Sequence, residues 1–146
     1  MLVRTTRFGT LEVEAEDVLA FANGLVGFED CRRWVLLADA ENPAIGWLQC
    51  VTRPAVALAV VSPRRFVPDY QFRVYRSELA ELELTGVADA QVVVVVGRND
   101  RAITLDLKAP IVIHLALRRG CQVVTHSDLP TQFEVAPLAT PLKMTA

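Results

Sequence analysis

The sequence has few of the residues on which metal binding and catalysis usually depend. Among 146 residues there are two histidines and three cysteines. The cysteine positions 31, 50 and 121 match no zinc-binding pattern, and an odd number leaves one thiol over in any disulfide scheme. We therefore expect Cys31, Cys50 and Cys121 to be reduced, buried thiols, and we expect neither a metal nor a cofactor.

Motifs for catalysis are also missing. The chain has no H-E-x-x-H, no G-x-S-x-G and no phosphate-binding loop. Residues 126–128, His-Ser-Asp, are the residue types of a triad, but neighbours in one turn cannot aim at one reacting atom. An enzyme would have to use His114, Asp106 and Cys121. We expect that the protein is not an enzyme.

The sequence has neither an excess of one charge nor a long apolar run. Fifteen Lys and Arg against 17 Asp and Glu leave a formal net charge of −2, whereas nucleic-acid-binding domains are normally basic. Arginine pairs at 32–33, 64–65 and 118–119 keep an RNA-binding barrel as an alternative. The longest apolar runs, 55–61 and 92–96, are much shorter than the roughly 20 residues of a membrane helix. No secretory signal is visible, so we expect a cytoplasmic protein that does not enter the membrane.

What the sequence does contain is a series of short strand patterns. Alternating or continuous apolar residues predict a hairpin at Val3–Glu14 and strands at Val18–Phe21, Trp34–Leu37, Ile45–Val51, Val56–Val61, Tyr70–Val74, Gln91–Val96, Ile103–Leu107, Ile111–Leu117 and Cys121–Thr125. One helix is predicted at Ser77–Leu84, with Ser77 as its cap and Gly86 after its end. The fold class is therefore mainly β, a small antiparallel β-barrel or curled sheet with one short helix.

Length and hydrophobicity indicate a single domain. About half of the residues are hydrophobic (52%), and a domain of this length buries roughly 68–70% of its unfolded surface. We assign residues 1–128 to one β-barrel-like domain. Residues 129–146 form a proline-containing C-terminal tail that is either part of the same domain or frayed.

The stretch Phe21–Asp30, FANGLVGFED, has neither a helix nor a strand pattern. It carries two glycines and three large apolar side chains: Gly24, Gly27, Phe21, Leu25 and Phe28. Glycine there indicates positive φ or a close approach of another segment, and the apolar side chains are too many for a solvated connection. We predict a packed loop, with Glu29 and Asp30 at its exposed end.

A second group of residues is typical of protein interfaces, where aromatic side chains are enriched. The group comprises Trp47, Gln49, Phe66, Pro68, Asp69 and Tyr70. Core packing explains Trp47 equally well. An unpaired Gln49 in an apolar strand would cost about 1–3 kcal/mol, so this side chain either clamps a loop or contacts a partner.

Several segments, taken in order, resemble the FliW family of bacterial flagellar assembly factors. Residues 21–29 resemble its F-x-x-G-L-P-G-F-E signature, with Val26 in place of the proline. Further matches are T-R-F-G at 6–9, W-L-Q-C at 47–50, P-D-Y at 68–70 and A-P-I-V-I at 109–113. Cys50, Asp106 and His114 depart from the serine and the two asparagines that are usual in the family.

The resemblance implies a small β-barrel-like fold and a non-enzymatic protein, which we expect to be a monomer. Members of the family bind newly made flagellin in the cytoplasm. When released they bind CsrA, the RNA-binding regulator, and relieve its repression of flagellin translation. The implied partners are flagellin and CsrA, without direct contact to nucleic acid. The alternative is a small RNA-binding barrel or a general protein-interaction domain.

We assign the partner-binding surface to Glu29 together with the interface group. For flagellin we expect an apolar contact built around Trp47, Phe66 and Tyr70. For CsrA, which must be basic where it holds RNA, we expect acidic residues to provide the contact through charge complementarity. These acidic residues are Glu12, Glu14, Glu16, Asp17 and Glu29.

Overall fold

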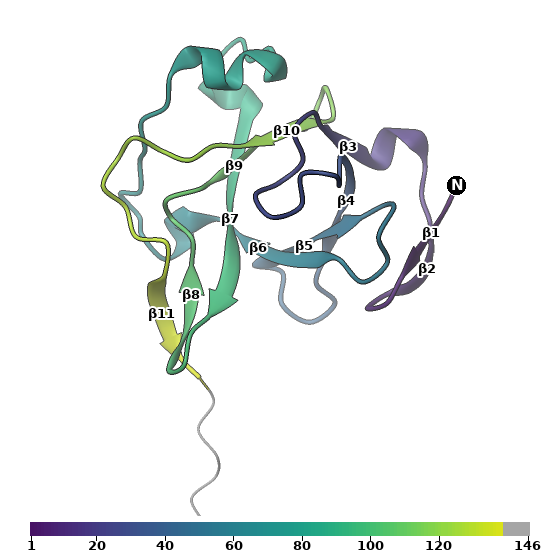
Figure 1. Ribbon diagram of the computed structural model, residues 1–146, viewed down its shortest axis with the longest axis horizontal. Coiled ribbons are helices and arrows are strands. Elements are labelled where there is room, and N and C mark those ends of the chain that lie inside the picture. The colour runs from purple at the N-terminus through teal and green to yellow at the C-terminus, as the bar shows by residue number, and fades with distance from the viewer. Residues whose placement is uncertain (139–146) are drawn as a thin grey trace, which may run out of the picture.

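In the computed structural model, which describes residues 1–138, seven strands close into a barrel (Figure 1). They are β3 (Val18–Phe21), β4 (Arg33–Ala38), β5 (Ile45–Cys50), β6 (Ala57–Val61), β7 (Ala90–Arg98), β9 (Ile111–His114) and β10 (Arg119–Gln122). Strands β3 to β7 pair antiparallel in chain order, and β9 pairs antiparallel with both β7 and β10. A parallel pairing of β10 with β3 closes the ring. The predicted fold class is confirmed, with this one parallel seam.

Four further strands lie outside the barrel. Strands β1 (Leu2–Thr5) and β2 (Gly9–Glu12) form the predicted N-terminal hairpin, which packs on the barrel through Val3. Strands β8 (Ala102–Leu105) and β11 (Phe133–Pro137) extend the sheet beyond β7. Strand β11 therefore lies within the segment that the sequence indicated as a tail. Residues 139–146 of that segment are outside the described residues.

The interior of the barrel is filled by alternate residues of its strands. Leu19 and Phe21 point inward from β3, and Ile111 and Ile113 point inward from β9, all four of them fully buried. In β3 this is the two-residue period of a strand with one face on the core, whereas β9 is buried on both faces, since Val112 packs in a separate cluster with Leu82. Trp34, also fully buried, is the largest side chain of this cluster. Removing these apolar surfaces from water is the main stabilising contribution to the barrel.

Short 3₁₀ helices cover the outside: η1 (Ala15–Asp17), η2 (Pro63–Arg65), η3 (Arg76–Leu82) and η4 (Val87–Asp89). The predicted helix Ser77–Leu84 is present as η3, but it starts one residue earlier and the capping residue is Tyr75. Ser77 is not the cap; the backbone N–H of Tyr75 donates to the Glu78 carboxylate at 2.7 Å. The helix ends at Leu82 and is capped by Glu83, which has a left-handed φ of 50°, so it does not reach the predicted end at Leu84. At seven residues, η3 is longer than the three or four residues that are usual for a 3₁₀ helix.

Three strand predictions are corrected by the structure. Residues 70–74 show the expected alternation of burial, but they pair with no strand among residues 1–138. Strand β9 ends at His114, and the turn to β10 runs through Leu115–Arg118 and not through residues 118–120. In β8, Ile103 is exposed and Thr104 is buried, the reverse of the prediction. Strand β8 lies between β7 and β11 outside the barrel, so the barrel interior does not decide which of its faces is covered.

Candidate functional site

The glycine-containing loop between β3 and β4 is a packed element, as predicted. Gly24 has a φ of +63°, and a Cβ at this position would lie 2.5 Å from the carbonyl oxygen of Phe28. Leu25 and Phe28 exchange backbone hydrogen bonds of 3.3 and 2.7 Å, and the Leu25 side chain is buried. The N–H of Val26 donates to Gln122 Oε1 at 2.8 Å, which joins the loop to β10. Gln122 in turn donates to the carbonyl of Ala109 at 2.9 Å.

The outer end of this loop is exposed. Glu29 accepts a hydrogen bond from the N–H of Gly27 at 3.1 Å, and its carboxylate faces solvent. Asp30 forms an ion pair with Arg53 at 3.4 Å, which links the exposed end of the loop to the turn after β5. Val26 is 62% exposed at the position where the family signature has proline. A partner approaching this end meets Val26 and Glu29.

Gln49 is a structural clamp. The side chain is fully buried, and its amide nitrogen lies 3.0 Å from the carbonyl of Cys50, 3.4 Å from that of Arg53 and 3.2 Å from that of Pro54. The Pro54 carbonyl also accepts the N–H of Thr6 at 2.9 Å. Gln49 therefore holds the turn after β5 against the N-terminal hairpin. Of the two roles that the sequence left open, the structure supports the clamp.

Trp47 lies in a half-buried cluster beside the N-terminal hairpin. Its indole N–H donates to Asp39 Oδ1 at 2.9 Å, and its ring meets that of Phe8 edge-on at 5.8 Å. The guanidinium of Arg7 lies 4.3 Å from the ring centroid. The hydrogen bond from Trp47 is the main cause that holds the pKa of Asp39 below its usual value. Both the ring and the N–H of the indole are thus engaged within the chain.

The residues Phe66 to Tyr70 follow η2 and differ in exposure. Phe66 is 42% exposed, and Pro68 and Asp69 are also exposed. Tyr70 is buried, and its hydroxyl donates to the carbonyl of Leu107 at 2.8 Å. Burial, with a smaller contribution from the charge of Asp106, raises the pKa of Tyr70 to about 12. Tyr70 therefore anchors the segment, whereas the side chain of Phe66 is exposed to solvent.

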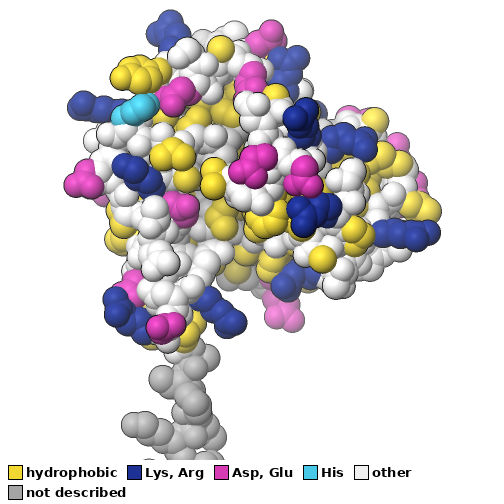
Figure 2. Space-filling view, in the orientation of Figure 1, with side chains coloured by type: hydrophobic (Ala, Val, Ile, Leu, Met, Phe, Trp, Pro, Cys, Tyr) yellow, Lys and Arg dark blue, Asp and Glu magenta, His cyan; other side chains and the backbone are white. Residues whose placement is uncertain are grey.

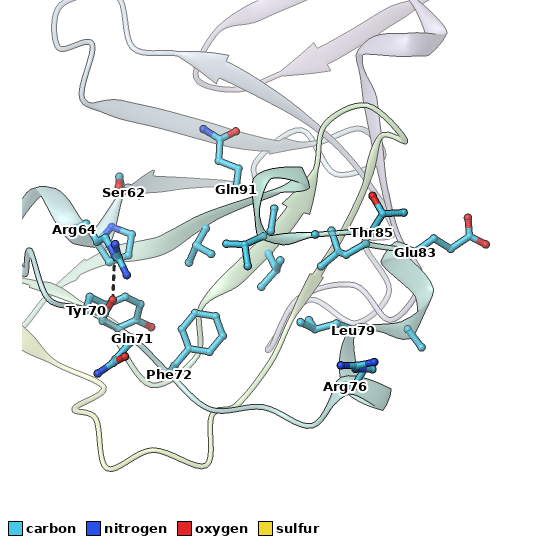
Figure 3. Close-up of a pocket in the computed structure, with 18 of the residues that line it drawn as sticks. Ser62, Arg64, Tyr70, Gln71, Phe72, Arg76, Leu79, Glu83, Thr85 and Gln91 are labelled. Atoms are coloured by element: carbon cyan, nitrogen blue, oxygen red, sulfur yellow. Dashed lines mark hydrogen bonds between the residues drawn. The ribbon is translucent and has the colours of Figure 1, made fainter.

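Beside Tyr70 the structure has a groove that the sequence did not indicate (Figure 3). It has a volume of about 1350 Å³, and its walls come from the end of β6, η2, residues 70–72, η3 and the start of β7. Phe72, Leu79 and Val92 contribute half-buried apolar surface. No sequence signal was available, because these segments meet only in the folded chain.

The three residues that an enzyme would have to use are held apart in separate roles. Asp106 accepts the backbone N–H groups of Lys108 and Ala109, both at 3.2 Å. The buried His114 accepts the N–H of Leu117 at 3.4 Å. Burial raises the pKa of the Cys121 thiol to about 12, which keeps it protonated at neutral pH and weakly nucleophilic. Within residues 1–138 no hydrogen bond or ion pair joins these three side chains.

All three cysteines are buried and unpaired, as predicted.

Charges of both signs are interspersed over the face seen in Figure 2, with apolar patches between them. The side chains of three of the paired arginines, Arg64, Arg118 and Arg119, are bonded within the chain. Arg118 donates to the carbonyl of Asp17 at 2.9 Å, and Arg119 pairs with Glu83 at 3.1 Å. No helix in the described part of the chain has the length and apolar character needed to cross a membrane.

The sequence also matches a known protein family. A family model described as FliW protein matches residues 2–135. The chain belongs to the FliW family. The matched span includes the glycine loop, the Gln49 clamp and the groove, so the family pattern covers the barrel and the outer layer alike.

Individual relatives agree with this assignment. The chain is 36% identical over 130 residues to "Flagellar assembly factor FliW" of Bdellovibrio bacteriovorus, which covers 88% of this chain and 74% of that protein. A protein of the same name from Moorella thermoacetica is 38% identical over 127 residues, covering 85% and 80%. A crystal structure of the flagellar assembly factor FliW superposes with a TM-score of 0.84 at 28% identity, covering 94% of this chain and 98% of that one.

Proposed function

We propose that this FliW-family protein is a non-enzymatic, cytoplasmic flagellar assembly factor that binds flagellin and, when free of flagellin, binds CsrA. The family match over residues 2–135 carries the proposal. Such a protein can relieve translational repression without catalysis, provided that flagellin and CsrA compete for it. Binding of flagellin then lowers the fraction of the protein that is available to CsrA. The protein would act as a monomer and contact no nucleic acid itself.

For flagellin, we propose a contact centred on Phe66 with Pro68 and Asp69. These three residues are exposed on the segment that Tyr70 anchors. Trp47, assigned to the same contact from the sequence, lies in the separate cluster with Phe8 and retains only part of its surface for a partner. Tyr70 supports this surface from within, whereas Gln49 holds the turn after β5 elsewhere in the fold.

For CsrA, we propose that acidic side chains provide the contact. Glu12, Glu14, Glu16 and Asp17 are all exposed on β2 and η1, and Glu29 is exposed on the glycine loop. Opposite charges across an interface accelerate association and make affinity dependent on salt. An acidic surface held near the RNA-binding face of CsrA would also repel phosphate.

The decisive experiment is a competition between the purified proteins. The chain is mixed with CsrA, flagellin is added in steps, and complexes are separated by size-exclusion chromatography. We expect one complex with each partner and displacement of CsrA by flagellin. Binding of neither partner would overturn the proposal, and simultaneous binding without displacement would overturn the switch.

Two variants separate the surfaces. Phe66→Ala should weaken flagellin binding by about tenfold and leave CsrA binding unchanged, because it removes one exposed aromatic anchor. Replacing Glu12, Glu16 and Glu29 by lysine should weaken CsrA binding and flatten its salt dependence, with Glu41→Lys as the control for a charge change elsewhere. An unchanged salt dependence would rule out the acidic contact.

A further inference from the structure

The groove beside Tyr70 is bordered by a strand edge that has no neighbour within residues 1–138. Strand β7 pairs with β9 through Ala90–Val93, and with β6 only at Val94 and Val95. On the β6 side, residues 90–92 therefore have no paired strand among the described residues. Unpaired N–H and C=O groups along such an edge are a template for another strand.

The cause of this opening lies at the end of β6. Continuing the register of Val61 with Val94 would place Pro63 opposite Val92. Proline has no N–H to donate to the ladder and ends a strand. The chain instead turns into η2 at Pro63 and moves away from β7. The space that the next residues of β6 would have occupied is part of the groove.

The opposite wall of the groove is also extended main chain. Residues 71 and 72 run without helix or strand structure, and their backbone groups take part in no hydrogen bond found within residues 1–138. Figure 3 shows Gln91 on one side of the groove and Gln71 and Phe72 on the other. The floor between them is apolar, with Val92 from β7 and Val112 from β9. The groove thus offers main-chain partners on two sides and apolar contacts below.

The lining of the groove has an excess of positive charge. Arg64, Arg76 and Glu83 are its charged lining residues. Glu83 is already paired with Arg119 at 3.1 Å. Arg64 uses its Nε to hold the carbonyl of Tyr70 at 3.1 Å, and within the described residues neither it nor Arg76 forms an ion pair. A carboxylate on an occupant would therefore find two cationic partners.

We propose that this groove binds an extended segment of a partner protein, which adds to β7 as a short strand beside Ala90–Val92. The three-residue edge spans about 10 Å at the rise of a strand. Alternate apolar side chains of the segment lie on Val92, Val112 and Phe72, and an acidic residue of the segment reaches Arg64 and Arg76. Strand addition with pockets for alternate side chains is a known mode of peptide recognition.

The experiment uses a phage-displayed library of random linear peptides, selected on the full chain. Enriched peptides are synthesised, and their dissociation constants are measured by fluorescence polarisation. We expect enriched sequences to alternate apolar residues and to contain Asp or Glu. Methylation of the peptide backbone nitrogens at alternate positions should weaken binding about tenfold in one phase of the alternation only, because only one set of N–H groups faces β7.

Two pairs of protein variants locate the site. Arg76→Glu should weaken binding by about tenfold, while Arg73→Glu, the same change at an exposed residue outside the groove lining, should change it by less than about threefold. Val87→Asp, at the mouth of the groove, is compared in the same way with Val124→Asp, which is exposed elsewhere. Circular dichroism verifies that each variant folds.

Several results would overturn the inference. These are an unenriched library, equal affinity for both methylated peptides, enriched peptides that are basic, or affinities that the groove variants do not change. Peptides that become helical on binding would show that the groove binds a helix and not an extended segment. Dimerisation of the chain that Val87→Asp abolishes would make a second copy the occupant. The test contains neither flagellin nor CsrA, so its failure and that of the proposed function are independent.

Discussion

The glycine loop and the groove wall differ in the hydrogen bonding of their backbone and in the burial of their apolar side chains. In the loop, residues 21–30, backbone groups of Leu25 and Phe28 bond one another, and Leu25 is buried. In the wall, residues 71–87, backbone groups of Phe72 have no partner in the described chain, and Val87 is 92% exposed. The loop thus satisfies its own backbone and packs into the core, whereas the wall leaves surface for a partner. Four predictions test this contrast.

The largest effect is expected at Gly24. Gly24→Ala should lower the free energy of unfolding by about 3 kcal/mol, because it combines a left-handed φ with a Cβ that overlaps the Phe28 carbonyl. Gly27 has a φ of +85° but open space around it, so Gly27→Ala should cost only about 1 kcal/mol. Urea unfolding of both variants measures the difference. Equal losses would show that the loop is not packed as described.

The Gln49 clamp should give the next largest effect. Gln49→Leu fills a similar volume but leaves the carbonyls of Cys50, Arg53 and Pro54 without the amide donor. We expect a loss of about 2 kcal/mol in urea unfolding. Trp47→Phe, which removes a hydrogen bond at a half-buried site, is the comparison and should cost less. A neutral Gln49→Leu would contradict the clamp.

Tyr70 stands between the two regions and provides a test by pH. Tyr70→Phe should cost about 1 kcal/mol, since it removes the hydrogen bond to Leu107. Because the folded pKa is raised from 10.0 to about 12, the stabilisation is complete below pH 10 and is lost as the pH rises through 12. The wild-type chain should therefore lose stability more steeply over this range than Tyr70→Phe. Identical slopes in urea unfolding at a series of pH values would contradict the assignment.

The smallest effect is expected at the groove. Val87→Ser should change the free energy of unfolding by less than about 0.5 kcal/mol, because the side chain is almost fully exposed. Leu82→Ala, at a fully buried position of the same outer layer, should cost about 3 kcal/mol. Thermal unfolding of the pair is sufficient. A large loss for Val87→Ser would mean that this surface belongs to the core.

The strands and the packed loop were predictable because their signals are local. Short continuous apolar runs mark β3 and β9 directly in the sequence, as do the apolar anchors Phe21 and Leu25. The alternating pattern failed at Tyr70–Val74, where alternate residues are less exposed but no strand pairs within residues 1–138. Burial depends on what lies beneath a segment, whereas strand assignment requires a neighbour at hydrogen-bonding distance.

The candidate surfaces were predictable only in part. Exposed Phe66 and Glu29 stood out by residue type and by the family motifs, but the separation of Trp47 from Phe66 did not. The roles of Gln49 and Tyr70 depend on carbonyls that belong to other segments. Residue type alone could therefore name these side chains and could not distinguish a clamp from a contact.

Local pattern determined which stretches of this protein extend, which side chains leave water and where glycine is required, because these follow from the period of the backbone and the hydrophobic effect. Tertiary structure alone decided that β10 closes the barrel on β3 and that β7 keeps one open edge. The physical reason is that a backbone hydrogen bond needs a partner from a distant part of the chain. Which partners meet is a property of the complete fold.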